Sequence, residues 1–158
     1  MKKIITINEL DAVVRKLKLE GKKIVLVGGC FDIVHIGHIE FLQKAKKQGN
    51  FLIVLLESDE SMKKMKGPSR PIHAQNLRAQ ILESLSSVDL IVQIPQLKTD
   101  EEYAKLVKRI EPDIIAVTKG DPILAKKKIH AQAVRAQVVA VIDRQQEHST
   151  SNLIKNLK

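Results

Sequence analysis

Two histidines three residues apart, just after a pair of glycines, are the side chains in this sequence best suited to chemistry. His35 and His38 close the segment that begins with Gly28 and Gly29. Positions i and i+3 of a helix share a face, so both imidazoles can point at one spot. The glycines let the backbone turn sharply and approach a ligand closely. A helix N-terminus binds anions, and histidine donors beside it suit a triphosphate whose charge shifts during transfer. The segment therefore predicts a nucleotide-phosphate site.

Two other interpretations of these histidines compete with the phosphate site. Either histidine alone is more typical of a structural residue whose ring is already hydrogen-bonded. The pattern His-x-x-His with Cys30 nearby is also compatible with a metal site. No second cysteine or cluster of carboxylates completes a tetrahedral set, so we expect no metal held by the protein alone.

A group of hydroxyls lies near the end of the chain. Ser149, Thr150 and Ser151 precede the apolar pair Leu153-Ile154. Hydroxyls in the first turn of a helix are typical N-cap residues, which is a purely structural role. The same turn also offers hydroxyl and N–H donors to a phosphate. The residues alone leave both roles open.

The pattern of apolar residues predicts the scaffold that must hold these groups. Short, mostly apolar runs indicate strands buried on both faces of a parallel sheet, at Ile24–Val27, Phe51–Leu56, Leu90–Ile94, Ile114–Val117 and Val138–Ile142. Helical spacing lies between them, at about 37–48, 74–86, 100–110 and 122–135, with a last short helix near Ser149. This alternation predicts one α/β domain over 1–158, with a Rossmann-like, doubly wound five-stranded parallel sheet and helices on both faces. Such sheets bind ligands beyond the carboxyl ends of their strands, where 28–38 begins.

Two capping boxes mark predicted helix starts. Thr6 with Glu9 precedes a helically spaced apolar set near the N-terminus, and Thr99 with Glu102 precedes the helix at 100–110. The stretch 63–71 is rich in glycine and proline and predicts a mobile loop.

Composition limits the class of partner. The net charge of +9 favours anionic partners, either nucleic acid or phosphorylated small molecules. Aromatic residues make up only 3%, which is poor material for stacking single-stranded bases, so we expect no nucleic acid. No apolar run approaches the roughly 18 residues that span a bilayer, and the start is too soon polar for a secretory signal. We expect a cytoplasmic protein without a membrane partner, and a single Cys30 excludes an internal disulfide.

The segment 28–38 resembles the G-x-F-D-x-x-H-x-G-H signature of the cytidylyltransferase-like nucleotidyltransferases. In that family the two histidines stabilise the phosphates of the NTP in the transition state, which implies this role for His35 and His38. The resemblance implies Mg²⁺ bound with the NTP. It also implies a nucleotide site that includes Gly29, Cys30, Phe31, Asp32 and Gly37. Asp32 is expected either to help hold the metal or to orient a histidine.

The resemblance extends along nearly the whole chain and implies further site residues. Lys46 matches the lysine of the family's A-K-x-x-G-D segment and is expected to reach a phosphate, and Arg144 matches an arginine ahead of the hydroxyl turn. That turn is expected to bind the β- and γ-phosphates through Ser149, Thr150 and Ser151. The base is expected near Gly120 and Asp121, and the acceptor near Arg70 and Arg78.

Within the family, the segments Gly-Cys-Phe-Asp and Lys-Gly-Pro-x-Arg-Pro are most similar to the branch that makes ADP-heptose from heptose 1-phosphate for the lipopolysaccharide core. The expected reaction transfers a nucleoside monophosphate, with AMP favoured, from an NTP to a small phosphorylated acceptor and releases pyrophosphate. A glycerol-3-phosphate cytidylyltransferase, an FAD synthase-like enzyme or a non-catalytic nucleotide-binding protein remain alternatives.

One more class shares part of this motif. His35-Ile36-Gly37-His38 also matches the signature of class I aminoacyl-tRNA synthetases, but 158 residues leave no room for their tRNA-binding domains. The sequence leaves a homodimer open.

Overall fold

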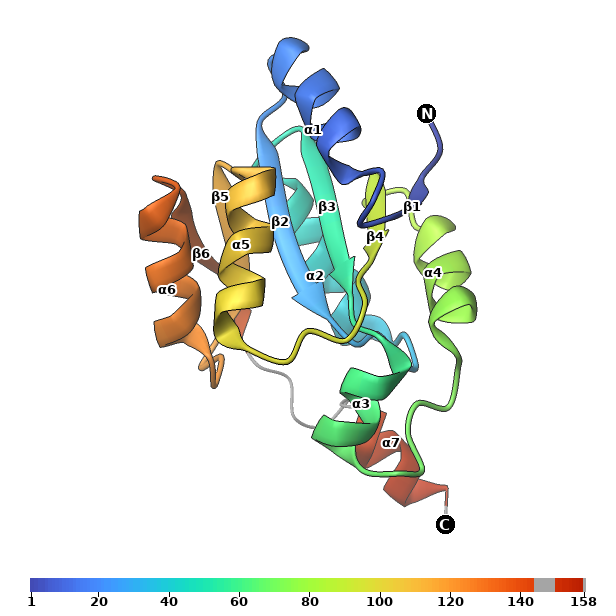
Figure 1. Ribbon diagram of the computed structural model, residues 1–158. Helices are drawn as coiled ribbons and strands as arrows, with labels where there is room; N and C mark the ends of the chain where they lie inside the picture. Colours follow the sequence, from blue (N-terminus) through green and yellow to red (C-terminus); the bar gives the residue numbers. More distant parts are fainter. Residues whose placement is uncertain (144–149, 158) are drawn as a thin grey trace.

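The computed structural model describes residues 1–143 and 150–157. The strands are β1 (Ile4–Thr6), β2 (Ile24–Gly29), β3 (Phe51–Leu56), β4 (Leu90–Gln93), β5 (Ile114–Lys119) and β6 (Gln137–Asp143). The helices are α1 (Leu10–Leu19), α2 (Ile36–Lys46), α3 (Asp59–Lys66), α4 (Gln75–Glu83), α5 (Asp100–Ile110), α6 (Leu124–Ala133) and α7 (Thr150–Asn156). The alternation that the sequence predicts is therefore present (Figure 1).

The strands form one parallel sheet in the order β1-β4-β3-β2-β5-β6. Within residues 1–143 the sheet has six strands, so the prediction of five was wrong by one. The additional strand is β1, which pairs Ile4 with Ile91 and Ile5 with Val92 at the edge of the sheet. Two apolar residues beside the polar start of the chain are too few to indicate a strand by their pattern alone.

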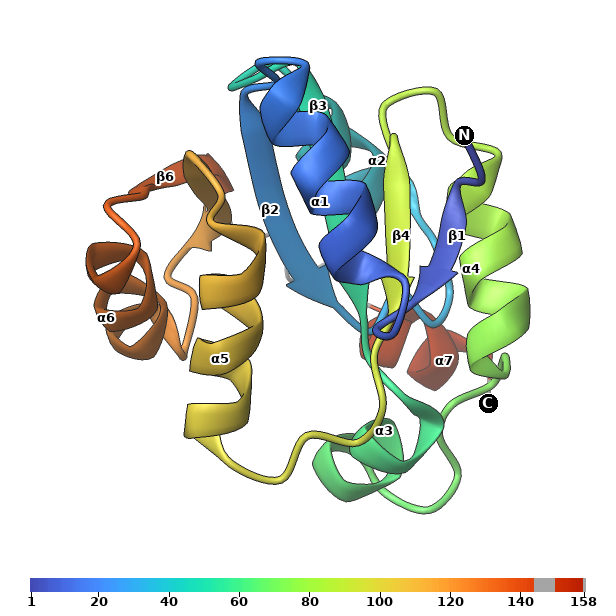
Figure 2. The ribbon, with the colours of Figure 1, turned by 45° about the horizontal axis from the view of Figure 1, so that its top comes forward.

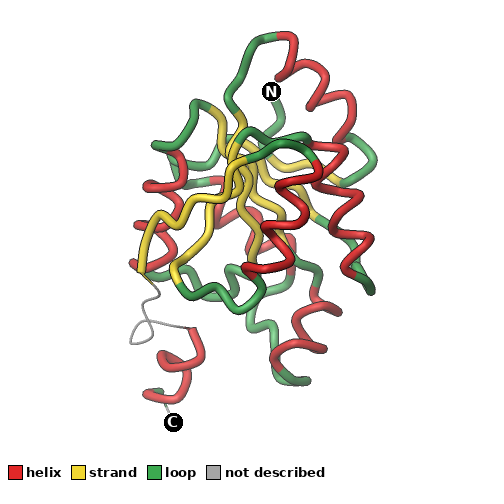
Figure 3. The backbone as a smooth tube through the Cα atoms, turned by 90° about the vertical axis from the view of Figure 1, so that its left-hand side faces the viewer, coloured by secondary structure: helices red, strands yellow, loops and turns green. Residues whose placement is uncertain are grey.

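Helices cover both faces of the sheet, as predicted (Figures 2 and 3). On one face α1, α5 and α6 pack against alternate strand residues such as Leu26 and Ile53. On the other face α2 and α4 pack against the intervening residues, such as Val27 and Val54. The strands β2, β3, β4 and β5 are buried on both faces, which explains why their apolar runs are continuous rather than alternating, whereas β6 is only partly buried.

Of the two predicted capping boxes, the one at Thr99 starts a helix, and the one at Thr6 does not. The Thr99 hydroxyl accepts a hydrogen bond from the Glu102 amide while the Glu102 carboxylate caps Thr99, and α5 begins at Asp100 as predicted. Near the N-terminus the Glu9 carboxylate accepts from the Thr6 amide at 2.8 Å. Thr6 itself ends β1, however, and α1 begins at Leu10.

The loop predicted at 63–71 is half helical. The helix α3 begins after Ser58, whose hydroxyl accepts a hydrogen bond from the Ser61 amide. It extends to Lys66 and ends at Gly67, which has a φ of 99°. The helices α3 and α7 lie beyond the carboxyl ends of the strands (Figures 1 and 3). None of the helices in the described part of the chain is long and apolar enough to span a membrane.

The strand order places a switch point at β2. From β2 the chain proceeds through β3 to β4 on one side, and it returns to β5 and β6 on the other side. A crevice opens beyond the carboxyl ends of strands at such a point. The histidine segment follows β2 directly, so the fold carries it to this crevice.

Candidate functional site

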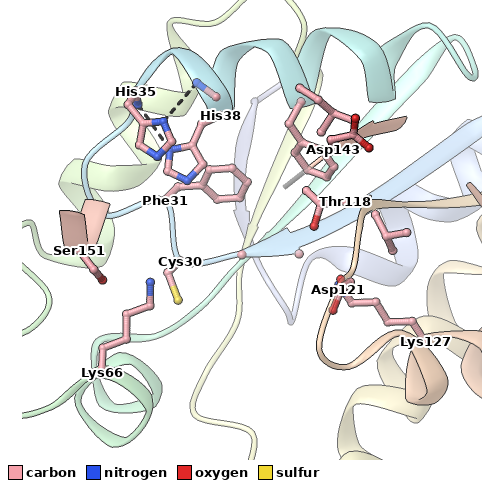
Figure 4. Close-up of a pocket in the computed structure, with 16 residues that line it drawn as sticks. Cys30, Phe31, His35, His38, Lys66, Thr118, Asp121, Lys127, Asp143 and Ser151 are labelled. Atoms are coloured by element: carbon pink, nitrogen blue, oxygen red, sulfur yellow. Dashed lines mark hydrogen bonds and ion pairs between the residues drawn. The ribbon is translucent and has the colours of Figure 1, made fainter. Parts of the chain in front are cut away.

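A cavity of about 430 Å³ lies at the carboxyl ends of β2 and β5. The histidine pair, Lys66 and Ser151 lie on one side of it, and Thr118, Asp121 and Asp143 lie on the other (Figure 4). Gly28, Gly29 and Cys30, at the end of β2, also line the cavity. The volume falls within the usual range of small-molecule sites.

The turn after β2 is built around Phe31. Phe31 has a φ of 46°, and its ring packs over Gly29, where an added Cβ would approach the ring to 2.8 Å. The ring also packs at an angle against His38, with 5.2 Å between centroids. Gly29 is therefore required for a close approach inside the turn.

The two histidines cap α2 reciprocally. His35 is the N-cap, and its Nδ1 accepts from the Gly37 amide at 3.1 Å. The His35 amide donates to Nδ1 of His38 at 3.4 Å. The rings lie 3.9 Å apart between centroids, so the spacing does bring both imidazoles to one spot at a helix N-terminus.

The surroundings of His38 keep its ring neutral at neutral pH. Burial lowers the pKa of His38 to about 4, with further lowering by the nearby His35 and Lys66. A hydrogen bond with the Ile33 backbone opposes the shift only in part. Because Nδ1 accepts from the His35 amide, the single N–H of the neutral ring is on Nε2, and His38 adds no positive charge to the cavity.

Lys66 is the cation that the sequence analysis missed. It ends α3, lines the cavity, and extends toward Cys30 in Figure 4. It comes from the Lys-Gly-Pro segment that carries part of the family resemblance, and that segment was the available signal.

Lys46 does not reach the cavity. It is the last residue of α2, whose first turn carries the histidines. Its ammonium lies 2.5 Å from Oδ2 of Asp89 and donates to the Asn50 carbonyl at 2.6 Å. The expected phosphate contact is therefore replaced by an ion pair at the opposite end of the helix.

Asp32 serves neither of its expected roles in this structure. Its side chain is 1% exposed and accepts hydrogen bonds from Arg70 Nε at 2.6 Å and from the amides of Ile72 and His73 at 2.9 to 3.0 Å. Burial alone would raise the pKa of Asp32, but the two amides and Arg70 outweigh it and hold the pKa below its ordinary value. The carboxylate thus fastens the segment after α3 to the histidine turn. Arg70, expected at the acceptor, is its buried partner and does not line this cavity.

Arg78 is also buried rather than available to an acceptor. Its side chain is 0% exposed, and it donates to the carbonyls of Cys30, Glu57 and His73 and to the carboxylate of Asp59. These bonds join α4 to the ends of β2 and β3. We correct its expected role from acceptor contact to structural support.

The remaining predicted residues are distributed as follows. Gly120 forms the turn after β5 with a φ of 77°, and Asp121 lines the cavity while it pairs with Lys127 at 2.6 Å. Gly37 and Ser151 also line the cavity, and Thr150 is the first residue of α7. The predictions for Arg144 and Ser149 lie outside the described residues.

A second cavity of about 610 Å³ opens between α3, α5 and α6. It shares Gly28, Gly29, Cys30 and Lys127 with the first cavity, so the two meet at the end of β2. Its wall contains Glu57 and Tyr103, neither of which the sequence analysis singled out.

Two polar contacts lie in the wall of this second cavity, one between Glu57 and Tyr103 and one between Asp100 and His130. The Tyr103 hydroxyl lies 2.8 and 3.0 Å from the two carboxylate oxygens of Glu57. Burial raises the pKa of Glu57, although the bonds from Tyr103 and Ser61 and the charge of Arg78 oppose it. Burial likewise raises the pKa of Cys30, between the two cavities.

A cavity at the switch point of a doubly wound parallel sheet, with two histidines at the start of the following helix, is typical of Rossmann-like nucleotide-binding proteins. A family model described as cytidylyltransferase-like matches residues 26–156, and the chain belongs to that family.

Individual relatives agree with this assignment. The chain is 41% identical over 157 residues to the bifunctional protein HldE of Campylobacter fetus subsp. fetus, which covers 99% of this chain and 32% of that protein. The chain thus spans about a third of the length of the curated relatives it matches. A lipopolysaccharide core biosynthesis protein from Thermoplasma volcanium superposes with a TM-score of 0.64 at 27% identity, covering 79% of this chain and 100% of that one. Pantoate-β-alanine ligase from Francisella tularensis, at a TM-score of 0.70 and 18% identity over 100% of this chain and 74% of that one, shares the fold.

Proposed function

We propose that this chain transfers the adenylyl group of ATP to the phosphate of heptose 1-phosphate or a similarly compact acceptor and releases pyrophosphate. The observation that carries the proposal is the grouping of two histidines, Lys66 and Ser151 on one side of a cavity at the switch point. The HldE relatives and the Thermoplasma neighbour support the heptose branch and a role in lipopolysaccharide core biosynthesis.

The two sides of the first cavity suit the two ends of a nucleotide. The triphosphate would lie by His35, His38 and Lys66, where donors and a cation face the phosphate oxygens. The base would lie by Thr118, Asp121 and Asp143, at the ends of β5 and β6. The α-phosphorus then lies near the end of β2, where the second cavity begins.

The second cavity suits the acceptor. An acceptor there would approach the α-phosphorus from the side opposite the pyrophosphate, which is the in-line arrangement. An oxygen of the acceptor phosphate bonds to the α-phosphorus, the bond from that phosphorus to the bridging oxygen breaks, and pyrophosphate leaves. No side chain becomes covalent. The chain contributes positioning and preorganised donors that stabilise the charge on the leaving group.

Mg²⁺ fits this site as a companion of the nucleotide. Among the described residues no group of three or more His, Cys, Asp and Glu side chains could hold a metal ion, and Asp32 is committed to Arg70. Asp121 and Asp143 line the cavity and could add a ligand to a Mg²⁺ held chiefly by phosphate oxygens. Such an ion neutralises part of the triphosphate charge.

The test is a competition assay with equal ATP and CTP, against heptose 1-phosphate and glycerol 3-phosphate, with products identified by mass. We expect ADP-heptose and pyrophosphate. Exclusive use of CTP with glycerol 3-phosphate would replace the proposed donor and acceptor, and binding of ATP without any product would indicate a non-catalytic nucleotide-binding protein.

A further inference from the structure

Glu57 follows β3 directly, and its carboxylate is one of the anionic groups that line the second cavity. Its amide donates to the Gly29 carbonyl at 3.1 Å, which fixes its backbone beside the shared wall. An anionic group in a cavity that would receive a phosphorylated acceptor requires an explanation, because like charges repel.

The carboxylate also keeps capacity for further hydrogen bonds. A carboxylate offers about four lone-pair sites. The hydroxyls of Tyr103 and Ser61 are the donors that the described residues direct at this group. Glu57 lines the second cavity beside apolar residues such as Leu26, Leu55 and Val107. The same cavity is also lined by charged and polar residues, which are Lys64, Lys98, Lys126, Lys127, Asp100 and His130.

We infer that Glu57, held in place by Tyr103, selects acceptors that carry hydroxyl groups next to the transferring phosphate. The inference rests on the proposed function. Sugar or polyol hydroxyls donate to the carboxylate while the acceptor phosphate stays at the junction beside Lys66. The negative charge of Glu57 disfavours an acceptor with a second anionic group at that position. An alkyl phosphate offers the half-buried carboxylate no donor beyond those of Tyr103 and Ser61.

The test uses two acceptors with the same carbon skeleton, glycerol 3-phosphate and propyl phosphate, together with heptose 1-phosphate. The Michaelis constant for each acceptor and for ATP is measured in the wild type and in Glu57→Gln, Glu57→Ala and Tyr103→Phe. Hydrogen bonds to a charged group suggest a rise of roughly 10- to 100-fold in the KM for hydroxylated acceptors in Glu57→Ala. Smaller rises are expected in Glu57→Gln and Tyr103→Phe, and the KM for propyl phosphate and for ATP should change little.

Glu60→Gln is the matched control, because Glu60 lies on the exposed side of the neighbouring α3. The inference is overturned if the ratio of the KM for glycerol 3-phosphate to the KM for propyl phosphate is the same in all three variants as in the wild type. It is equally overturned if the KM for every acceptor and the KM for ATP rise together, because that result would show that Glu57 is a structural residue. A wild type that releases no pyrophosphate with any acceptor would instead refute the proposed function, and so the two failures are distinguishable.

Discussion

At the scale of single residues, the charge state of each side chain around the first cavity follows from its burial and its neighbours. His38 is kept neutral by burial and by its neighbours, and Lys66 supplies positive charge beside it. Asp32, the acidic residue of the same turn, is withdrawn from the cavity by Arg70 and two backbone amides. The result is a cavity side that offers donors and one ammonium to phosphate oxygens.

The low pKa of His38 predicts a pH-dependent loss of stability. The folded protein holds His38 neutral down to a pKa of about 4, whereas the unfolded chain takes up a proton near the ordinary histidine pKa of 6.5. Below pH 6.5 the unfolded state therefore binds more protons, and the free energy of unfolding falls as pH falls from 6.5 to 4. The loss amounts to at most about 3 kcal/mol. Urea unfolding at several pH values checks this prediction. The difference in free energy of unfolding between the wild type and His38→Gln should shrink toward pH 4. A difference that stays constant over this range would contradict the pKa.

Lys66 and Lys46 should differ sharply when each is changed to alanine. Lys66→Ala removes the lysine on the histidine side of the cavity and should lower turnover by roughly 10²-fold, as loss of one preorganised stabiliser does. Lys46→Ala breaks the pair with Asp89 and should cost about 1 to 3 kcal/mol of stability while turnover changes little. Steady-state kinetics and thermal unfolding of both variants separate the two roles, with Lys63→Ala on the exposed face of α3 as the control. A strong loss of turnover in Lys46→Ala, together with wild-type turnover in Lys66→Ala, would reverse the roles assigned to the two lysines.

At the scale of elements, the sequence predicts best what local chemistry decides. The histidine pair and the Thr99 capping box both depend on contacts within one turn, and the structure has both. The strand β1 depends instead on pairing with β4, more than eighty residues away. The burial of Arg78 likewise depends on carbonyls that come together only when β2, β3 and α4 pack. Such long-range contacts leave no periodic pattern in the sequence. A buried structural arginine therefore cannot be distinguished from a binding-site arginine by the sequence alone.

Arg78 should therefore behave as a structural residue. Arg78→Ala leaves Asp59 and three carbonyls without their donor and should lower the free energy of unfolding by about 3 to 5 kcal/mol. Chemical denaturation measures this loss. The acceptor KM of the fraction that remains folded should match the wild type. A stable variant with a selectively raised acceptor KM would restore the role that the sequence first suggested.

At the scale of the whole molecule, two cavities meet at the end of β2. The strand order creates the crevice, α2 brings the histidines to it, and α3 brings Lys66. The net charge of +9 favours two anionic substrates in neighbouring cavities. This arrangement explains why one small sheet could join two phosphorylated molecules without a covalent intermediate.

The most direct measurement of that claim is the release of pyrophosphate from ATP with and without heptose 1-phosphate. We predict that pyrophosphate appears only with both substrates, in a one-to-one ratio with ADP-heptose. His38→Ala should lower the rate by roughly 10²-fold or more while the protein stays folded. Pyrophosphate release that does not depend on an acceptor, or a His38→Ala variant as fast as the wild type, would contradict the account.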